Sequence, residues 1–332
     1  MKKKHKWRVG KKENQNKFTF VQYVPSDWVE KKIIRNIWIS GYRIFLNRNK
    51  LQFIEKILDL DEIRLVFLFG KFSYLDTKDA KIDFLPEGKF RFDQTKIKRA
   101  ISNEDVYLLI ITPFDKNSAN WNEAVIKEKV DIYLGLLILF FGRNIAHELI
   151  FENVYGISDN QVSASAARCE NPLFFPSPDL NEEKFNNIFL VNKFILQKPE
   201  DEKNRFLLSL RWFKNANFDS GVDAFLKYWI ALEIIAMSNN TDIQSINQIL
   251  GKIYNLPLVG IQKTFNMGRL YGLRSKIIHN GKIIPIHQNL LKYIEAIYKD
   301  VYYFLSGIQP KKFSEEILND NSFNLLEYMP NL

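Results

Sequence analysis

Arg274 and His279 are two residues suited to chemistry at phosphate, and they stand five positions apart. The arginine guanidinium carries a permanent charge, and its planar fork matches phosphate oxygens. The histidine imidazole titrates near neutrality, so it can accept and donate protons. RNA cleavage by the 2′-hydroxyl needs such proton transfers and a cation over the developing phosphorane. The two residue types are suited to this reaction, and reliance on the 2′-hydroxyl would make RNA the substrate and not DNA.

The spacing constrains how the two side chains can act. Five residues at about 100° each leave Arg274 and His279 about 140° apart around a regular helix, so one helix does not turn both toward the same phosphate. We expect the helix to end here, with Gly281 near the C′ position. His279 would then lie in the last turn, where the helix dipole favours the imidazolium.

The motif lies in a stretch without acidic residues. No Asp or Glu occurs between Asp242 and Glu295, although acids number 38 of 332 residues. The basic residues of this stretch are Lys252, Lys263, Arg269, Arg274, Lys276, Lys282 and Lys292. A locally positive surface suits nucleic acid; the alternative is a basic face packed near acids from elsewhere in the fold. Much of the net charge of +9 comes from a separate basic N-terminal tail that precedes Glu13, either a solvated terminus or a nucleic-acid contact.

Three segments occur in an order typical of one family. They are Arg205–Ala216 (RFLLSLRWFKNA), Trp229–Glu233 (WIALE) and Leu273–Gly281 (LRSKIIHNG). Together they resemble the Apea-like branch of HEPN domains, with its W-x-A-L-E helix and its Arg-x4-His motif followed by Gly. The resemblance covers about residues 200–310.

The resemblance implies a helical HEPN domain with Arg274 and His279 as the catalytic residues of an endoribonuclease. It also implies a homodimer whose two motifs face one another, and a role in bacterial anti-phage defence or as a toxin. The expected partners are RNA, a second copy of the chain, and an antitoxin or defence-system protein. Many active HEPN ribonucleases have Asn, Asp or His where this chain has Ser275. Residues expected to support the site or bind RNA are Glu233, Ser275, Lys276, Asn280 and Lys282.

Other interpretations of the motif remain open. Arg274 and His279 could be a structural pair in an inactive HEPN protein that serves as an RNA- or protein-binding scaffold. A separate antitoxin could hold the nuclease inactive. Glu233 lies in an apolar helix and needs a partner, because a lone buried charge is costly. Arg274 is one candidate, so Glu233 is an orienting residue or a catalytic one.

Other chemistries have little support in the sequence. Gly70-Lys71 stands without the rest of a P-loop, and no dinucleotide-binding or nucleophile-elbow motif occurs. The single Cys169 excludes an internal disulfide and a multi-Cys zinc site. We expect no metal and no cofactor. Three further histidines have other interpretations. His287 is interpreted as a surface or capping residue, His147 as a core or boundary residue, and His5 as part of the tail.

The expected location is the cytoplasm, without a membrane partner. The basic start of the chain is not followed by an apolar segment, so we expect no signal peptide. The most apolar run, Tyr133–Gly142, is far shorter than the roughly 20 residues that cross a bilayer.

The first 118 residues predict a mixed α/β module. Ile63–Phe69 and Val106–Ile111 are continuous apolar runs of the length of buried strands, and Phe18–Val24 is a further strand candidate. Asp83–Gly88 predicts a turn region. Together with the helical patterns that follow, these segments predict an α+β fold.

From about residue 120 the periodicity is helical. Trp121–Leu149 predicts one helix or two, with breaks at Gly135 or Gly142, and Ser158–Pro178 predicts an exposed connection before the next helix. Later helical patterns cover 201–215, 220–237, 242–255, 260–279 and 287–307. The second is apolar nearly all round, so it is predicted to be the central helix of a bundle, with Asp219 or Ser220 as its N-cap. The predicted regions are an α/β module (1–118), a helical connecting region (119–199), a HEPN-like bundle (200–310) and a tail (311–332).

Overall fold

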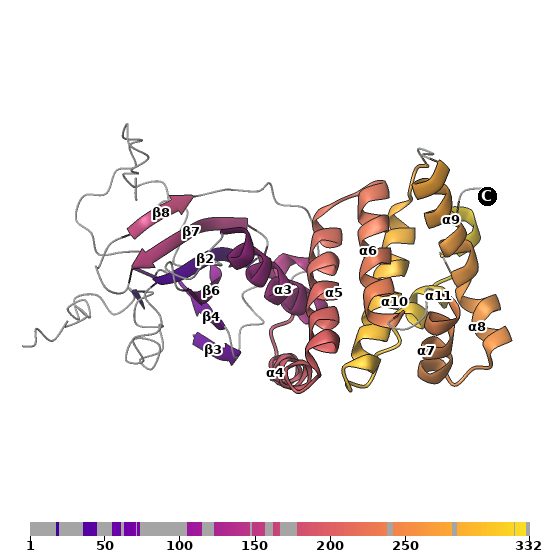
Figure 1. Ribbon diagram of the computed structural model, residues 1–332, viewed down its shortest axis with the longest axis horizontal. Coiled ribbons are helices and arrows are strands. Elements are labelled where there is room, and N and C mark those ends of the chain that lie inside the picture. Colours follow the sequence, from indigo (N-terminus) through magenta and orange to yellow (C-terminus); the bar gives the residue numbers. More distant parts are fainter. Residues whose placement is uncertain are drawn as a thin grey trace, which may run out of the picture. The chain divides into compact units, whose positions relative to one another are not determined.

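The structure, a computed structural model, divides the chain into two compact units (Figure 1). The first comprises Met1–Val130 and Phe141–Phe185, and the second comprises Asp131–Phe140 and Asn186–Leu332. Strands dominate the first unit and helices the second, so the fold is α+β with a helical C-terminal part, as the sequence predicts. The described residues are 18–19, 36–44, 55–60, 63–70, 72–73, 105–114, 123–146, 148–156, 162–166, 178–237, 242–280, 284–321 and 323–329.

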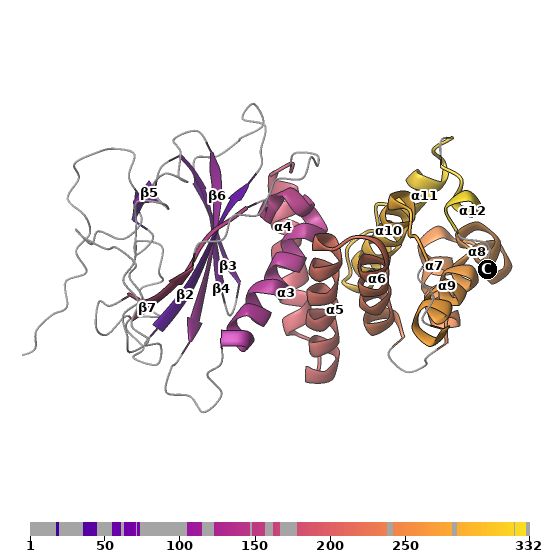
Figure 2. The ribbon, with the colours of Figure 1, turned by 90° about the horizontal axis from the view of Figure 1, so that it is seen from above.

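A six-stranded antiparallel sheet organises the described part of the first unit (Figure 2). Its strands, in spatial order, are β3 (Glu55–Leu60), β4 (Ile63–Phe69), β6 (Val106–Phe114), β2 (Asn36–Ile44), β7 (Glu148–Gly156) and β8 (Val162–Ala166). The short strands β1 (Phe18–Thr19) and β5 (Phe72–Ser73) form a separate parallel pair.

The two apolar runs form the buried strands β4 and β6, as predicted. Leu65–Leu68 and Tyr107–Ile111 are fully buried, which requires cover on both faces of the sheet and explains why the runs do not alternate with polar residues. The neighbouring edge strand β3 alternates between exposed and more buried positions. Its charged residues Glu55, Lys56 and Asp59 discourage pairing with another chain.

Strand β2 lies at the centre of the sheet but has no clear strand pattern in the sequence. Ser40 is fully buried within it, and its pairing with β7 shifts register between Gly41 and Tyr42. The extra residue at this point belongs to β7, because Gly41 pairs with Phe151 and Tyr42 with Leu149. In β2 itself, a Ser-Gly pair interrupts the apolar run. This is the reason why β2 was not predicted.

The helical prediction over Trp121–Leu149 is wrong after residue 142. Helix α3 (Glu123–Phe141) ends before Gly142, whose φ of +80° suits the C′ position. A short 3-10 helix, η3 (Arg143–Ala146), and strand β7 follow, so β7 and β8 lie in the stretch predicted as a helical connecting region.

Gly135 does not break α3, although the sequence offered it as a break. A Cβ atom at this position would lie 2.2 Å from the carbonyl oxygen of Leu210 in α5 (Glu200–Phe218). Glycine is therefore needed here because the two helix backbones approach closely.

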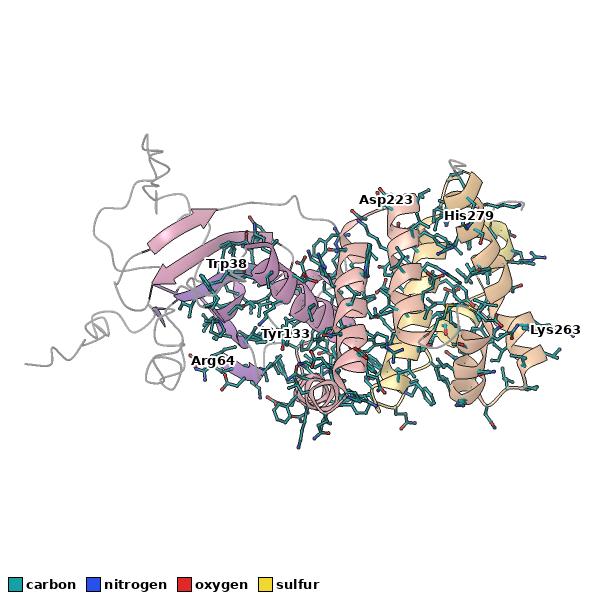
Figure 3. All side chains as sticks on the ribbon, viewed as in Figure 1. Trp38, Arg64, Tyr133, Asp223, Lys263 and His279 are labelled. Atoms are coloured by element: carbon teal, nitrogen blue, oxygen red, sulfur yellow. The ribbon has the colours of Figure 1, made fainter. Side chains whose placement is uncertain are left out.

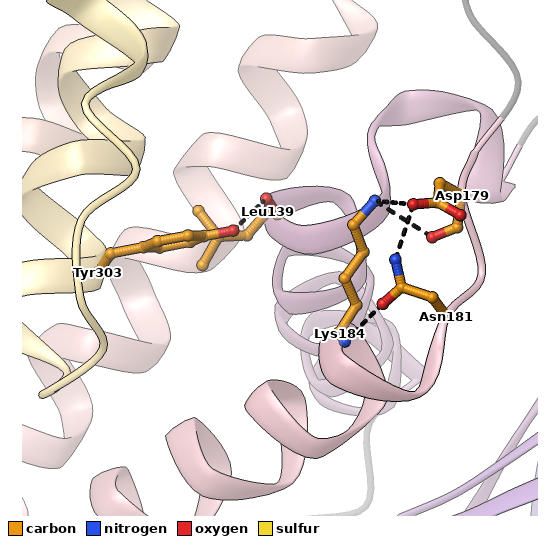
Figure 4. Close-up of polar contacts among 5 residues, drawn as sticks. All are labelled: Leu139, Asp179, Asn181, Lys184 and Tyr303. Carbon is orange, nitrogen blue, oxygen red and sulfur yellow. Dashed lines mark hydrogen bonds and ion pairs between the residues drawn. The ribbon is translucent and has the colours of Figure 1, made fainter.

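Helix α4 (Glu182–Leu196) begins where the sequence predicts a helix after Pro178. The Asn181 side chain accepts the backbone N–H of Lys184 at 3.0 Å and donates to Asp179 at 2.7 Å (Figure 4). The first of these bonds satisfies one of the free backbone N–H groups in the first turn of α4. Of the other early predictions, Phe20–Val24, Asp83–Gly88 and most of Ser158–Pro178 lie outside the described residues.

The helical unit follows the predicted pattern closely. After α5 come α6 (Gly221–Ala236), α7 (Gln244–Tyr254), α8 (Leu258–Phe265), α9 (Met267–Asn280) and α10 (Gln288–Leu305). The pattern over 260–279 corresponds to two helices, because Asn266 adopts a left-handed conformation (φ +52°) between α8 and α9. Ser220 occupies the N-cap position of α6, without a side-chain cap bond, and Asp219 ends α5.

Helix α6 is central in this unit, as predicted, and packs against α5, α7, α9 and α10. The Ser209 hydroxyl of α5 donates to the carbonyl of Ala231 at 2.8 Å and lies 2.9 Å from the Tyr298 hydroxyl of α10. Phe213 stacks on Tyr298 with ring centroids 4.4 Å apart, and burial raises the pKa of that tyrosine well above its usual range. The Tyr303 hydroxyl of α10 donates to the carbonyl of Leu139 in α3 (Figure 4).

Among the described helices, none is both long and apolar enough to cross a membrane.

The C-terminal segment is fixed by a buried carboxylate. The sequence predicts only a tail after residue 310, but α11 (Phe313–Leu318) and α12 (Leu325–Tyr328) form there; helices of so few residues have no readable periodicity. Asp300 of α10 is fully buried and accepts the backbone N–H groups of Phe313 and Ser314, each at 2.9 Å. It also accepts the hydroxyls of Ser314 and Tyr254, each at 2.6 Å. Burial and this bond raise the pKa of Tyr254 above its usual range.

Asp300→Ala should therefore destabilise the protein by at least about 3 kcal/mol, because several buried donors lose their acceptor at once. Asp300→Asn keeps one acceptor oxygen and should lose less. Denaturant unfolding measures both, with the exposed Glu316→Ala as the control, expected within about 0.5 kcal/mol of the original. A loss for Asp300→Ala no larger than the control would contradict this role.

Candidate functional site

Helix α9 carries the Arg-x4-His motif. Its inner face consists of Met267, Leu270, Leu273 and Ile277, all buried, at the spacing of an amphipathic helix. Arg274 lies at the border of this face and is about three-quarters buried. His279 is exposed in the last turn, near one end of the helix (Figure 3). The helix ends at Asn280, where the sequence predicts its end, although Gly281 itself lies outside the described residues.

Glu233 of α6 is the partner of Arg274, as expected for a carboxylate in an apolar helix. Its Oε2 atom lies 3.5 Å from Nη2 of Arg274. Its Oε1 atom accepts the indole N–H of Trp229, one turn earlier in α6, at 2.7 Å. Both carboxylate oxygens are thus engaged, and the ion pair joins α6 to α9.

Arg274 has spare hydrogen-bonding capacity. A guanidinium offers five N–H donors, and the contact to Glu233, at the long limit of a hydrogen bond, is the one that it makes within the described residues. Its Nε atom is buried and has no partner there. This buried atom is not accessible to a ligand, so the donors that could meet an additional anionic partner are those of the two terminal nitrogens.

The structure does not turn His279 toward Arg274. Both residues lie on the uninterrupted helix α9, so the offset of about 140° holds. Arg274 reaches inward to Glu233, whereas His279 is exposed. Ser275 and Lys276 lie on the same helix and are half-buried. The last two predicted site residues have no described side chain. Asn280 is described only by its backbone, at the end of α9, and Lys282 lies outside the described residues.

The acid-free stretch forms α7, α8 and α9. Lys252, Lys263 and Arg269 are exposed, one on each helix. Within the described part of the chain, none of the three has an acidic partner within 4.0 Å. Among the described residues, these three side chains are therefore exposed basic groups without an ion-pair partner.

The other described histidine, His287, is not part of this site. His287 caps α10, accepting the backbone N–H of Asn289 at 3.1 Å, and stacks on Tyr328; this agrees with its prediction as a capping residue. His147 and His5 lie outside the described residues. Among the residues that the structure describes, His, Cys, Asp and Glu side chains do not gather in groups that could hold a metal ion.

The contribution of Trp229 was not predicted from the sequence. The family pattern identified the residue, but the bond from its indole N–H to Glu233 was not foreseen. The signal was present in the spacing, because residues four apart on a helix face one another. Tyr271 of α9 was also missed; its ring lies 6.2 Å from that of Trp229.

Comparison of the chain with family models, curated proteins and solved structures finds no match. The resemblance to HEPN domains therefore rests on the three sequence segments.

Proposed function

We propose that the helical unit is a HEPN-type endoribonuclease that cleaves RNA without a metal or a cofactor. One observation carries the proposal: Arg274 is held in place by Glu233 through a single long contact while its other donors stay uncommitted among the described residues. Exposed basic residues without an acidic partner among the described residues lie on α7, α8 and α9, and α9 carries the motif. This combination suits the binding of a phosphate group.

The proposed reaction uses the 2′-hydroxyl of RNA as the nucleophile. His279 takes the proton of this hydroxyl as its oxygen attacks the adjacent phosphorus, and the imidazolium that results donates a proton to the 5′-oxygen of the next nucleotide as that oxygen leaves. Arg274 stabilises the charge on the non-bridging oxygens. The products are a 2′,3′-cyclic phosphate and a 5′-hydroxyl.

The site requires a second copy of the chain in this proposal. The offset between Arg274 and His279 keeps one helix from directing both at one phosphate. Tyr271 and Ile278, seven residues apart on α9, are 36% and 45% exposed, and this apolar edge could be covered in a dimer. A homodimer would bring two motifs together.

The proposed setting is a bacterial defence or toxin system in the cytoplasm, with an antitoxin or another defence protein as the regulating partner. The second candidate function is an inactive HEPN scaffold that binds RNA or protein. The Arg274–Glu233 pair favours it, because the same contact stabilises the packing of α6 against α9. Growth arrest on expression that disappears with His279→Ala distinguishes the two, since a scaffold does not need the imidazole for arrest.

Replacing either motif residue tests the assignment of the site. Arg274→Ala and His279→Ala should each lower RNA cleavage by about 100-fold or more. The Tm of each should change by no more than roughly 4 °C, because neither side chain is fully buried. His287→Ala is the control for the histidine and should retain most activity, because His287 caps α10 and lies outside the motif. Loss of folding in parallel with loss of activity would instead support a structural pair.

The products test the mechanism. Cleavage should persist in EDTA and leave a 2′,3′-cyclic phosphate upstream and a 5′-hydroxyl downstream. A 2′-deoxy substitution at the scissile nucleotide should block cutting there and leave binding nearly unchanged. End-group analysis by mass spectrometry measures this. Strict dependence on Mg²⁺ with 5′-phosphate ends would reject the mechanism.

Light scattering tests the dimer. The mass in solution should be about twice the 39.2 kDa of one chain. A protein that is fully active and strictly monomeric would contradict a shared site.

A further inference from the structure

Trp229 makes the shortest contact in the cluster around Arg274. Its side chain is fully buried in α6, and its indole N–H donates to Oε1 of Glu233 at 2.7 Å. The distance from Glu233 to Arg274 is longer, 3.5 Å. The carboxylate is therefore bound more closely by the neutral indole than by the guanidinium.

This geometry departs from the usual pairing of arginine with a carboxylate. Such pairs commonly form two parallel bonds of about 2.7 to 2.9 Å. Here the indole occupies one carboxylate oxygen, so only Oε2 faces Arg274. The indole N–H holds Oε1 in a position where only Oε2 contacts the guanidinium, so the guanidinium keeps unused donors.

We infer that Trp229 is a positioning residue that limits how tightly Glu233 holds Arg274, so that the guanidinium stays available to an anion. This inference rests on the proposed function for the identity of that anion, an RNA phosphate. Glu233 orients Arg274, and Trp229 limits the strength of the ion pair between the Glu233 carboxylate and the Arg274 guanidinium. Without the indole N–H, both carboxylate oxygens can turn to Arg274 and compete with the phosphate.

The position of α9 does not depend on the indole N–H. The Trp229 ring packs against Tyr271, with centroids 6.2 Å apart, and against Phe225, 6.4 Å apart. The inner face of α9, including Leu270 and Leu273, is fully buried. A substitution that keeps an aromatic ring but lacks the N–H therefore isolates the hydrogen bond from the packing.

A double-mutant cycle on the full chain tests this. Trp229→Phe, Glu233→Gln and the double variant are compared, with Trp212→Phe in α5 as the matched control, since Trp212 is half-buried and makes no described contact with the cluster. The probe is an RNA oligonucleotide with 2′-methoxy groups, which binds but lacks the nucleophile. A second readout is the rate at which phenylglyoxal modifies Arg274, followed by peptide mass spectrometry.

Trp229→Phe should weaken binding of this probe roughly threefold to tenfold, the effect of one hydrogen bond, and should slow modification of Arg274. Glu233→Gln should act in the opposite direction on both, because it removes the competing charge. In the Glu233→Gln background, Trp229→Phe should have no further effect, since the indole acts through the carboxylate. Trp212→Phe should change neither readout.

An equal effect of Trp229→Phe with and without the Glu233 carboxylate would overturn the inference, as would an unchanged modification rate of Arg274 in Trp229→Phe. If Trp229→Phe fails to fold, replacing Trp229 by benzothienylalanine keeps the ring size and removes only the N–H. The modification rate separates this inference from the proposed function: a chain that cleaves no RNA refutes the nuclease, whereas the reactivity of Arg274 still supports or refutes the role of Trp229.

Discussion

A carboxylate within an apolar helix must be compensated, and this constraint organises the site. Glu233 lies on α6, the helix around which α5, α7, α9 and α10 pack. Its two oxygens are engaged by Trp229 from the same helix and by Arg274 from α9. The same contacts that relieve the burial of Glu233 therefore fix the position of the arginine. A change in this carboxylate alters the packing of two helices and the electrostatics of the motif together.

The period of the α-helix imposes a second constraint. Arg274 and His279 lie on one uninterrupted helix, so they point in different directions. The inward arginine is held by α6, whereas the exposed histidine is left for another molecule. In a site shared between two copies, Arg274 from one chain and His279 from the other could face the same phosphate, so α9 would not need to be distorted. The lack of acidic residues on α7, α8 and α9 is consistent with a phosphate-bearing ligand on the same surface.

The sequence predicts those elements whose pattern is set by burial alone. The strands β4 and β6 and the helices from α5 to α10 have strong apolar patterns and were predicted, except that α8 and α9 were predicted as a single helix. The strand β2 was missed because Ser40 and Gly41 interrupt its pattern. The strand β7 was missed because the helical prediction was extended past Gly142 to Leu149. In the site, the pairing of Glu233 with Arg274 follows from the cost of a buried charge. The four-residue spacing of Trp229 and Glu233 indicates that they can meet, but the fact that Trp229 lies closer to the carboxylate than Arg274 does depends on atomic distances, which no residue pattern contains.

Mixing two inactive variants tests the central claim most directly. Arg274→Ala retains His279, and His279→Ala retains Arg274, so a mixed dimer contains one site with both residues. After joint unfolding and refolding, the mixture should cleave RNA in the presence of EDTA, although each variant alone is inactive. A mixture as inactive as its components, with mixed dimers detected by mass spectrometry, would contradict a ribonuclease site shared between two copies of this chain.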